Sequence, residues 1–267
     1  MIRGVTRDYN ERITMIAVPF LDDNYPVRTV ISGQDDLYRT GWKEDATRNA
    51  ILAEFVNADL RRVVYGEQTH SGNVLAVTAK SSEDRLVHVD ETLTVKWKGG
   101  YDSMVTSVPG VMLCVSTADC LPVFLYDAMN HAVGIAHSGW RGTCSGIAVS
   151  MIDAMKRLYG TRPDDLKAVL GPSNCGNCYE VEDDVLIHFR KRYDDGEMKQ
   201  IVRPKGEDKY LLDNKAAVRL DLIKAGIDPK MIHDTGICSF ESPDYASYRR
   251  DGRVEYHQQT LSGIVLI

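Results

Sequence analysis

Residues 111–142, with the sequence VMLCVSTADCLPVFLYDAMNHAVGIAHSGWRG, contain three short apolar runs in close succession. Short runs rich in β-branched residues and bounded by Gly, Pro, Asp or Ser are typical of buried strands. Similar runs occur on both sides of this stretch, so a sheet-based core is predicted. The predicted strands are Val63 to Tyr65, Val111 to Val115, Val123 to Tyr126, Ala132 to Ala136 and Ala168 to Leu170.

Three other segments have the periodicity of helices. Apolar residues of segment 147–158 fall on one face, and Gly160 follows as a helix C-cap. A second helix is predicted from Asp45 to Asn57, and a third from Asn214 to Ala225, opened by Asp213. The mixture of strand–strand and strand–helix connections indicates an α/β or α+β layered architecture.

The chain shows no repeat and no composition shift that would divide it, so residues 1–267 are predicted to form a single domain. The charged segment from Arg192 to Lys209, which contains Gly196, Pro204 and Gly206, is predicted to be an exposed loop.

Composition excludes several classes of protein. The net charge is −6 and the basic residues are scattered, whereas nucleic-acid binding needs a clustered cationic face. The charged N-terminal region has no apolar core of a signal peptide, and no window has the length of a membrane span. We therefore expect a cytoplasmic enzyme that contacts neither nucleic acid nor membrane. In that reducing compartment six cysteines are expected as thiols or metal ligands rather than disulfides.

Reactive side chains gather in three segments: Gln68 to Gly72, Thr117 to Pro122 and Ala136 to Gly142. Each segment lies where a predicted strand ends or a loop begins, which is where binding groups are usually found. Together they supply His70, Cys120 and His137. A catalytic zinc ion takes three such imidazole and thiolate ligands and leaves a fourth position open. From the residues alone, the alternative that these are ordinary core side chains stays open.

Two more cysteines form a Cys-x-x-Cys pair, Cys175 and Cys178. Such a pair suggests redox or zinc chemistry, but no second Cys-x-x-Cys completes a zinc site. Cys178 is interpreted as a residue lining the pocket and Cys175 as incidental. Cys238 is interpreted as a packing residue.

The three segments resemble the laccase-domain family, also called multicopper polyphenol oxidases of the YfiH type. The resemblance also includes Gly171-Pro172-Ser173, the stretch Cys178-Tyr179-Glu180-Val181 and the run 247–252, SYRRDG. It extends from about Arg48 to Asp251. The pairing of Thr-Ala-Asp-Cys-Leu-Pro with His-Ser-Gly-Trp-Arg-Gly is highly specific.

The resemblance implies a four-layer α/β/β/α sandwich with mixed sheets. It also implies a zinc-dependent purine nucleoside phosphorylase with adenosine deaminase activity, which acts on adenosine, inosine, guanosine and methylthioadenosine. Family zinc ligands correspond to His70, Cys120 and His137. One departure is Ser138, where the family usually has Ala, and this residue adds a hydroxyl near the predicted metal.

Phosphorolysis needs a group that binds phosphate, and the guanidinium fork suits that task. Arg48 and Arg141 are predicted to bind substrate or phosphate, whereas Arg249 is interpreted as part of a structural ion pair with its neighbours. Arg141 can alternatively pin its own loop by hydrogen bonds. Asp119 and Glu180 are candidates for the acid or base near the metal.

Several alternatives remain open. Cys120 can act as the nucleophile of a metal-free hydrolase with His70 or His137 as base. Some relatives suggest an amidase that edits peptidoglycan precursors, and a non-catalytic binding protein is a third possibility. Copper oxidation of phenols is disfavoured, because the seven histidines contain no His-x-His pair, although copper can replace zinc adventitiously. The sequence indicates no oligomeric state.

Overall fold

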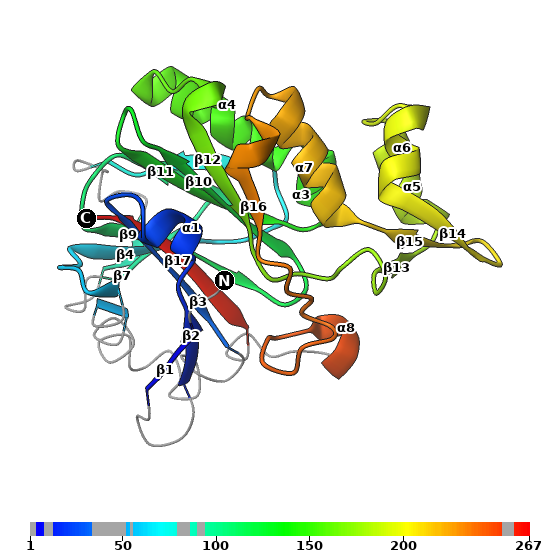
Figure 1. Ribbon diagram of the computed structural model, residues 1–267, viewed down its shortest axis with the longest axis horizontal. Coiled ribbons are helices and arrows are strands. Elements are labelled where there is room, and N and C mark those ends of the chain that lie inside the picture. The colour runs from blue at the N-terminus through cyan, green and yellow to red at the C-terminus, as the bar shows by residue number, and fades with distance from the viewer. Residues whose placement is uncertain are drawn as a thin grey trace.

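Two mixed β-sheets form the centre of the computed structural model, which describes residues 4–7, 13–33, 52–53, 56–78, 86–89, 94–252 and 259–267 (Figure 1). The larger sheet has eight strands in the order β1 (Gly4–Arg7), β2 (Ile13–Ile16), β3 (Val27–Ser32), β17 (Thr260–Leu266), β9 (Val111–Thr117), β4 (Arg62–Gly66), β7 (Thr94–Trp97) and β6 (Leu86–Val89). The second has six, in the order β16 (Ile232–Asp234), β12 (Leu166–Leu170), β10 (Leu121–Asp127), β11 (Ala132–Ser138), β8 (Ser103–Thr106) and β5 (Val74–Ala76).

The main core lies between the two sheets. Leu113 and Ile264 from the larger sheet share a buried cluster with Phe124, Ile135 and Val169 from the smaller one. All seven residues of β9, β10 and β11 are buried, as the continuous apolar runs predict for strands covered on both faces. The strands predicted at 63–65, 111–115, 123–126, 132–136 and 168–170 are confirmed by β4, β9, β10, β11 and β12.

Helices cover the outer face of each sheet. Helices α4 (Ile147–Tyr159) and α7 (Asn214–Lys224) pack on the six-stranded sheet (Figure 1). On the other side, Leu52 and Val56, which are both helical, pack against β4, β9 and β17. The result is the predicted α/β/β/α arrangement of layers. The rest of the second predicted helix, Asp45 to Asn57, is mostly outside the described residues.

Local signals explain where α4 and α7 begin and end. Gly160 ends α4 with a positive φ of 74°, a conformation that costs glycine little. The side chain of Asp213 accepts a hydrogen bond from the Ala216 amide at 2.8 Å and so caps α7. A cap of this kind contributes about 1 kcal/mol to helix stability.

The prediction of a loop from Arg192 to Lys209 is wrong. Helix α6 (Asp195–Ile201) begins there with a capping box, in which Asp194 and Glu197 each accept a hydrogen bond from the other's backbone amide. Strand β14 (Val202–Gly206) follows and pairs with β15 (Lys209–Leu212), which also pairs with β13 (Glu180–Val181). Gly and Pro punctuate the turn and the exposed edge of this small sheet rather than a loop.

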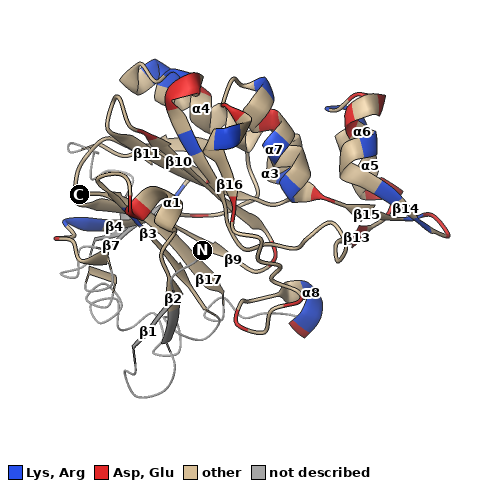
Figure 2. Cartoon of the chain, in the orientation of Figure 1, with Lys and Arg blue, Asp and Glu red and all other residues tan. Residues whose placement is uncertain are grey.

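A fourth apolar cluster joins this three-stranded sheet to α7, α6 and α5 (Asp183–Arg190). These elements lie to one side of the two main sheets (Figure 1). Acidic and basic residues lie beside one another along the helices in the view of Figure 2. None of the helices formed by the described residues is both long and apolar enough to cross a membrane.

Candidate metal centre and cleft

The hairpin of β10 and β11 places two of the predicted ligands at one end of the six-stranded sheet. Pro122 pairs with His137 and Leu121 pairs with Ser138, so the start of β10 meets the end of β11. Cys120 directly precedes β10, and His137 is the last but one residue of β11. The antiparallel register therefore brings together two residues that are 17 positions apart in the sequence.

The third predicted ligand, His70, lies in the loop after β4 with a φ of 59°, which is unusual for a residue with a side chain. Asp102 stabilises this loop. Its carboxylate accepts hydrogen bonds from the backbone amides of Thr69, His70 and Ser71 at 3.1, 3.0 and 2.6 Å. The loop is thereby folded around one buried carboxylate.

His70, Cys120 and His137 lie close enough to bind one metal ion. Their candidate ligand atoms are all within 4.8 Å of one another. The Sγ atom of Cys120 is 3.9 Å from Nε2 of His70, and the two imidazole rings meet edge-on with centroids 4.9 Å apart. Tetrahedral zinc with such ligands separates their donor atoms by about 3.3–3.8 Å, so small movements suffice to close the site.

Asp102 also orients His137. Its Oδ1 atom is 2.9 Å from His137 Nδ1, and Asp102 is fully buried. This hydrogen bond assigns the proton to Nδ1 and leaves Nε2 with its lone pair, which is the arrangement found around ligand histidines. Burial opposes ionisation of Asp102, but the hydrogen bonds from His137 and Ser71 outweigh it and lower the pKa of Asp102 to about 2.

The electrostatics of the metal-free site favour a thiolate. Burial raises the pKa of Cys120, but the imidazoles of His137 and His70 outweigh burial and lower this pKa to about 6. Burial disfavours the charged form of His137, whereas Cys120 and Asp102 favour it and raise the pKa of His137 to about 9. A thiolate is the form of cysteine that binds metals and attacks electrophiles.

Gly139 leaves the space that a bound ion needs. A Cβ atom at this position would lie 2.8 Å from Cys120 Sγ and 3.0 Å from His70 Cδ2. Its φ of −72° is accessible to any residue, so the requirement for glycine is steric. The donor set and this space together fit a small soft cation.

The three residues open into a cleft of about 600 Å³. Its walls come from the ends of β4, β9, β10 and β11, from the segment before β13 and from the chain near α8 (Tyr248–Asp251). The lining residues are Gln68, His70, Ser116, Ala118, Asp119, Cys120, His137, Gly139, Trp140, Arg141, Ser173, Asn174, Tyr179, Asn214, Tyr248, Arg249 and Gln259. This volume suits a small organic substrate.

The comparisons with known proteins agree with this site. Residues 43–261 match the family described as multi-copper polyphenol oxidoreductase laccase. The chain belongs to this family. The resemblance seen in the sequence motifs is thereby confirmed, and the matched range contains all three predicted ligands.

Relatives with assigned names act on nucleosides according to those names. Purine nucleoside phosphorylase YlmD of Bacillus subtilis is 32% identical over 201 residues, which cover 75% of this chain and 70% of that protein. Adenosine deaminase RL5, from an unknown prokaryotic organism, is 34% identical over 203 residues, covering 75% and 74%. The crystal structure of YlmD from Geobacillus stearothermophilus has a TM-score of 0.79 at 26% identity and covers 99% of both chains.

The predicted arginines have different positions. Arg48 lies outside the described residues. Arg141 is exposed, lines the cleft and stacks on Trp140, with its guanidinium carbon 4.2 Å from the ring centroid. The Trp140 side chain packs with the apolar cluster of α5, α6 and α7. Trp140 therefore supports the arginine from below.

The interpretation of Arg249 as part of an ion pair is wrong. Arg250 makes the ion pair with Asp251, at 2.6 Å, and donates hydrogen bonds to the carbonyl oxygens of Ser239, Ser242 and Tyr245. Arg249 instead turns into the cleft and stacks on Tyr179 at 5.0 Å. Adjacent arginines are alike in sequence, so only the packing of α8 distinguishes them.

The two acid–base candidates also separate. Glu180 forms salt bridges with Lys205 and Lys209 at 2.6 and 3.0 Å, and it is absent from the cleft lining. Asp119 does line the cleft, but its two oxygens accept hydrogen bonds from the Ser239 hydroxyl and the Arg249 amide. Asp119 is the sole carboxylate among the described lining residues, and it positions two neighbouring segments.

Three polar side chains of the lining have unused hydrogen-bonding capacity. Ser173 Oγ, Asn174 Oδ1 and Asn214 Oδ1 are buried and have no partner among the described residues. Buried polar atoms usually find partners, so these atoms are candidates for contacts with a polar ligand. The Ser138 hydroxyl, in contrast, lies 2.8 Å from Thr143 Oγ1 and is already engaged.

Sequence reasoning missed two features. Asp102 was not singled out, although it follows two glycines and precedes a strand. Cys175 and Cys238, interpreted as incidental and as a packing residue, both belong to a second group of potential metal ligands with Cys178 and Glu241. Cys178 is not among the residues lining the cleft, so that prediction is wrong as well.

Proposed function

We propose that this protein is a zinc-dependent purine nucleoside phosphorylase with adenosine deaminase activity. The observation that carries the proposal is the convergence of His70, Cys120 and His137 at the base of a cleft that also presents two unpaired arginines. Adenosine, inosine, guanosine and methylthioadenosine are the proposed substrates. Relatives named for each of the two activities support the reaction classes.

The zinc ion would be held by His70, Cys120 and His137, with Asp102 fixing the His137 ring. When bound, zinc supplies a Lewis acid that lowers the pKa of a coordinated water and polarises substrate oxygen or nitrogen. Three protein ligands leave a coordination position free, as catalytic zinc sites do. The close approach of Gly139 keeps the space beside Cys120 and His70 free.

Phosphate would be held by Arg141 and Arg249. Both guanidinium groups are free of ion pairs with any described residue and face the same cleft. Their stacking on Trp140 and Tyr179 limits side-chain motion, so less entropy is lost when an anion binds. In phosphorolysis a phosphate oxygen bonds to ribose C1′ while the C1′–N9 bond breaks, and the leaving base takes up a proton.

Ribose hydroxyls or base nitrogens would use the unfilled polar atoms of Ser173, Asn174 and Asn214. In deamination, water adds to C6 of adenosine and ammonia leaves, so phosphate has no part. The two reactions thus share the zinc ligands but differ in their need for the arginines.

The test is an assay of the four nucleosides with and without phosphate, in the parent and in Cys120→Ala. We expect free base and ribose 1-phosphate only when phosphate is present, and ammonia from adenosine in either case. Cys120→Ala should lower both activities to the uncatalysed background. Cys144→Ala is the matched control, because Cys144 is a partly buried thiol outside the cleft lining. Full phosphorolysis by Cys120→Ala would overturn the proposal.

A cysteine hydrolase is the second candidate, because the site also contains a Cys–His–Asp series. Cys120, His137 and Asp102 lie in the order nucleophile, base and orienting carboxylate. Hydrolysis of an amide, such as one in a peptidoglycan precursor, would then need no metal. A metal-free parent that cleaves amides and leaves nucleosides intact would favour this candidate. Copper oxidation would need a multi-histidine cluster, and His70 and His137 are the two histidines at the described cleft.

A further inference from the structure

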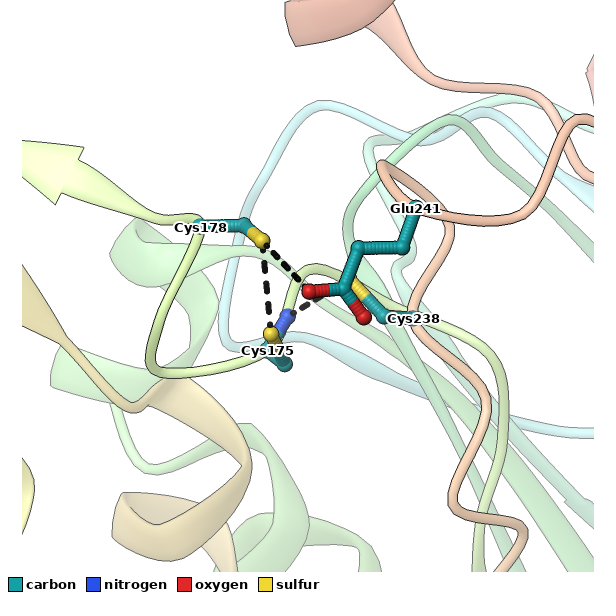
Figure 3. Close-up of side chains that lie close together, drawn as sticks. All are labelled: Cys175, Cys178, Cys238 and Glu241. Atoms are coloured by element: carbon teal, nitrogen blue, oxygen red, sulfur yellow. Dashed lines mark hydrogen bonds between the residues drawn. The ribbon is translucent and has the colours of Figure 1, made fainter.

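A second group of metal-binding side chains lies outside the cleft lining. Cys175 and Cys178 come from the turn before β13, whereas Cys238 and Glu241 come from the segment after β16. Figure 3 shows the four side chains pointing toward one another. Each segment supplies two ligands with two residues between them, which is the spacing of structural zinc sites.

The distances fit a tetrahedral ion. Cys175 Sγ lies 3.5 Å from Cys178 Sγ, and Cys178 Sγ lies 3.3 Å from Glu241 Oε1. Around zinc, with bonds of about 2.3 Å to sulfur and 2.0 Å to oxygen, neighbouring ligand atoms are about 3.5–3.8 Å apart. All four candidate ligand atoms are within 4.8 Å of one another.

Backbone amides surround one of the sulfur atoms. The Cys175 amide donates a hydrogen bond to Cys238 Sγ at 3.4 Å (Figure 3). Burial raises the pKa of Cys238, but amides of Cys175, Glu241 and Phe240 outweigh burial and lower it. Amide donors of this kind stabilise a thiolate, whereas a cysteine that only fills space has no use for them.

We propose that Cys175, Cys178, Cys238 and Glu241 bind a second zinc ion, which is structural and closes its four-ligand site. The proposal does not depend on the reaction catalysed in the cleft. Three thiolates and a carboxylate balance the ion's charge, and soft ligands of this type select zinc over magnesium or calcium.

This ion would fasten two segments that build the cleft wall. Ser173 and Cys238 already form a parallel β-bridge between the segments. The residues next to the ligands contact Asp119: the Asn174 amide donates to its carbonyl oxygen at 3.1 Å, and the Ser239 hydroxyl donates to Oδ1 at 2.8 Å. Asp119 directly precedes Cys120, so the second zinc would stabilise the support of the first.

A disulfide between Cys175 and Cys178 is the main competing interpretation. It would use two of the sulfur atoms and leave Cys238 and Glu241 without a role. The two interpretations predict different thiol counts. Denatured protein, after zinc is chelated, should titrate six free thiols if zinc is bound and four if the disulfide forms.

The experiment measures zinc per chain in the full-length protein purified without thiol reductants. The parent should contain two zinc ions. Cys175→Ala should lose one, Cys120→Ala should lose the other, and the double variant should lose both. Cys144→Ala should retain both, because its thiol is in neither group. This pattern separates failure of the second site from failure of the first.

Glu241→Gln keeps the test informative if cysteine variants fold poorly, because Glu241 is exposed. In a Cys120→Ala background, competition with a chromophoric chelator should show zinc bound about tenfold or more weakly, since loss of even a supporting group costs about 10–100-fold. Cobalt in the same background should give sulfur-to-cobalt absorption that decreases with each cysteine removed. A parent with no zinc sensitive to Cys175→Ala, or with a Cys175–Cys178 disulfide, would overturn the proposal.

Discussion

His137 Nδ1 lies 2.9 Å from Asp102 Oδ1, and the same carboxylate accepts the amide hydrogen bond of His70. One buried residue thus positions two of the three proposed zinc ligands. The first prediction is that Asp102→Asn weakens zinc binding about 10–100-fold, as expected when the partner of a ligand histidine is lost. Chelator competition measures this change. Asp153→Asn, on the exposed side of α4, should have no effect, and tight zinc binding by Asp102→Asn would refute the role of Asp102.

The second prediction concerns acid stability of the metal-free protein. Asp102 has a pKa of about 2 in the folded state, below its ordinary value of 3.8. A carboxylate with a lowered pKa stabilises the fold above pH 3.8, and this stabilisation is lost as pH falls toward 2. The loss amounts to about 2 kcal/mol. Denaturant unfolding from about pH 5 down to about pH 3 should fall less steeply for Asp102→Asn than for the parent. Parallel curves would contradict the assignment.

The third prediction is that Gly139→Ala impairs zinc binding through steric overlap with Cys120 and His70. Overpacking of this kind costs about 1–3 kcal/mol, which corresponds to about 10–100-fold in affinity. Gly142→Ala in the same short helix, α3 (Trp140–Cys144), is the matched control, because its added Cβ would meet neighbours at an ordinary 3.5 Å. Equal zinc affinities for the two variants would show that Gly139 serves the backbone instead.

The fourth prediction separates the two proposed reactions. Arg141→Gln and Arg249→Gln should each raise the KM for phosphate about 10–100-fold, because each removes a hydrogen bond to a charged group worth about 1.5–3 kcal/mol. Adenosine deamination should change much less. Arg157→Gln, on the surface of α4, is the control. If phosphate kinetics are unaltered while deamination falls, the arginines bind the nucleoside rather than phosphate.

Much of the fold was predictable because the central strands are buried on both faces. Their continuous apolar runs need no partner to be recognised, and the caps at Asp213 and Gly160 mark helix ends locally. The segment 192–209 was mispredicted because its helix is stabilised by a capping box and by packing against α7 rather than by a long apolar face. Local composition describes such a segment poorly.

The site shows a similar division. The ligands His70, Cys120 and His137 stand in motifs that can be read along the chain. Asp102 acts only through contacts with residues 31 to 35 positions away, so nothing beside it in the sequence reveals its role. Cys238 and Glu241 are 63 residues from their partners, and only the neighbouring β12 and β16 bring the two segments together. Long-range pairing of this kind is set by topology.

Removal and return of zinc tests the central claim most directly. The parent is stripped with a chelator, zinc is added back in measured amounts, and phosphate-dependent release of hypoxanthine from inosine is followed. The account predicts that activity vanishes in the stripped protein and returns in proportion to zinc bound at His70, Cys120 and His137, with Cys120→Ala recovering none. Full phosphorolysis by the metal-free protein would contradict it.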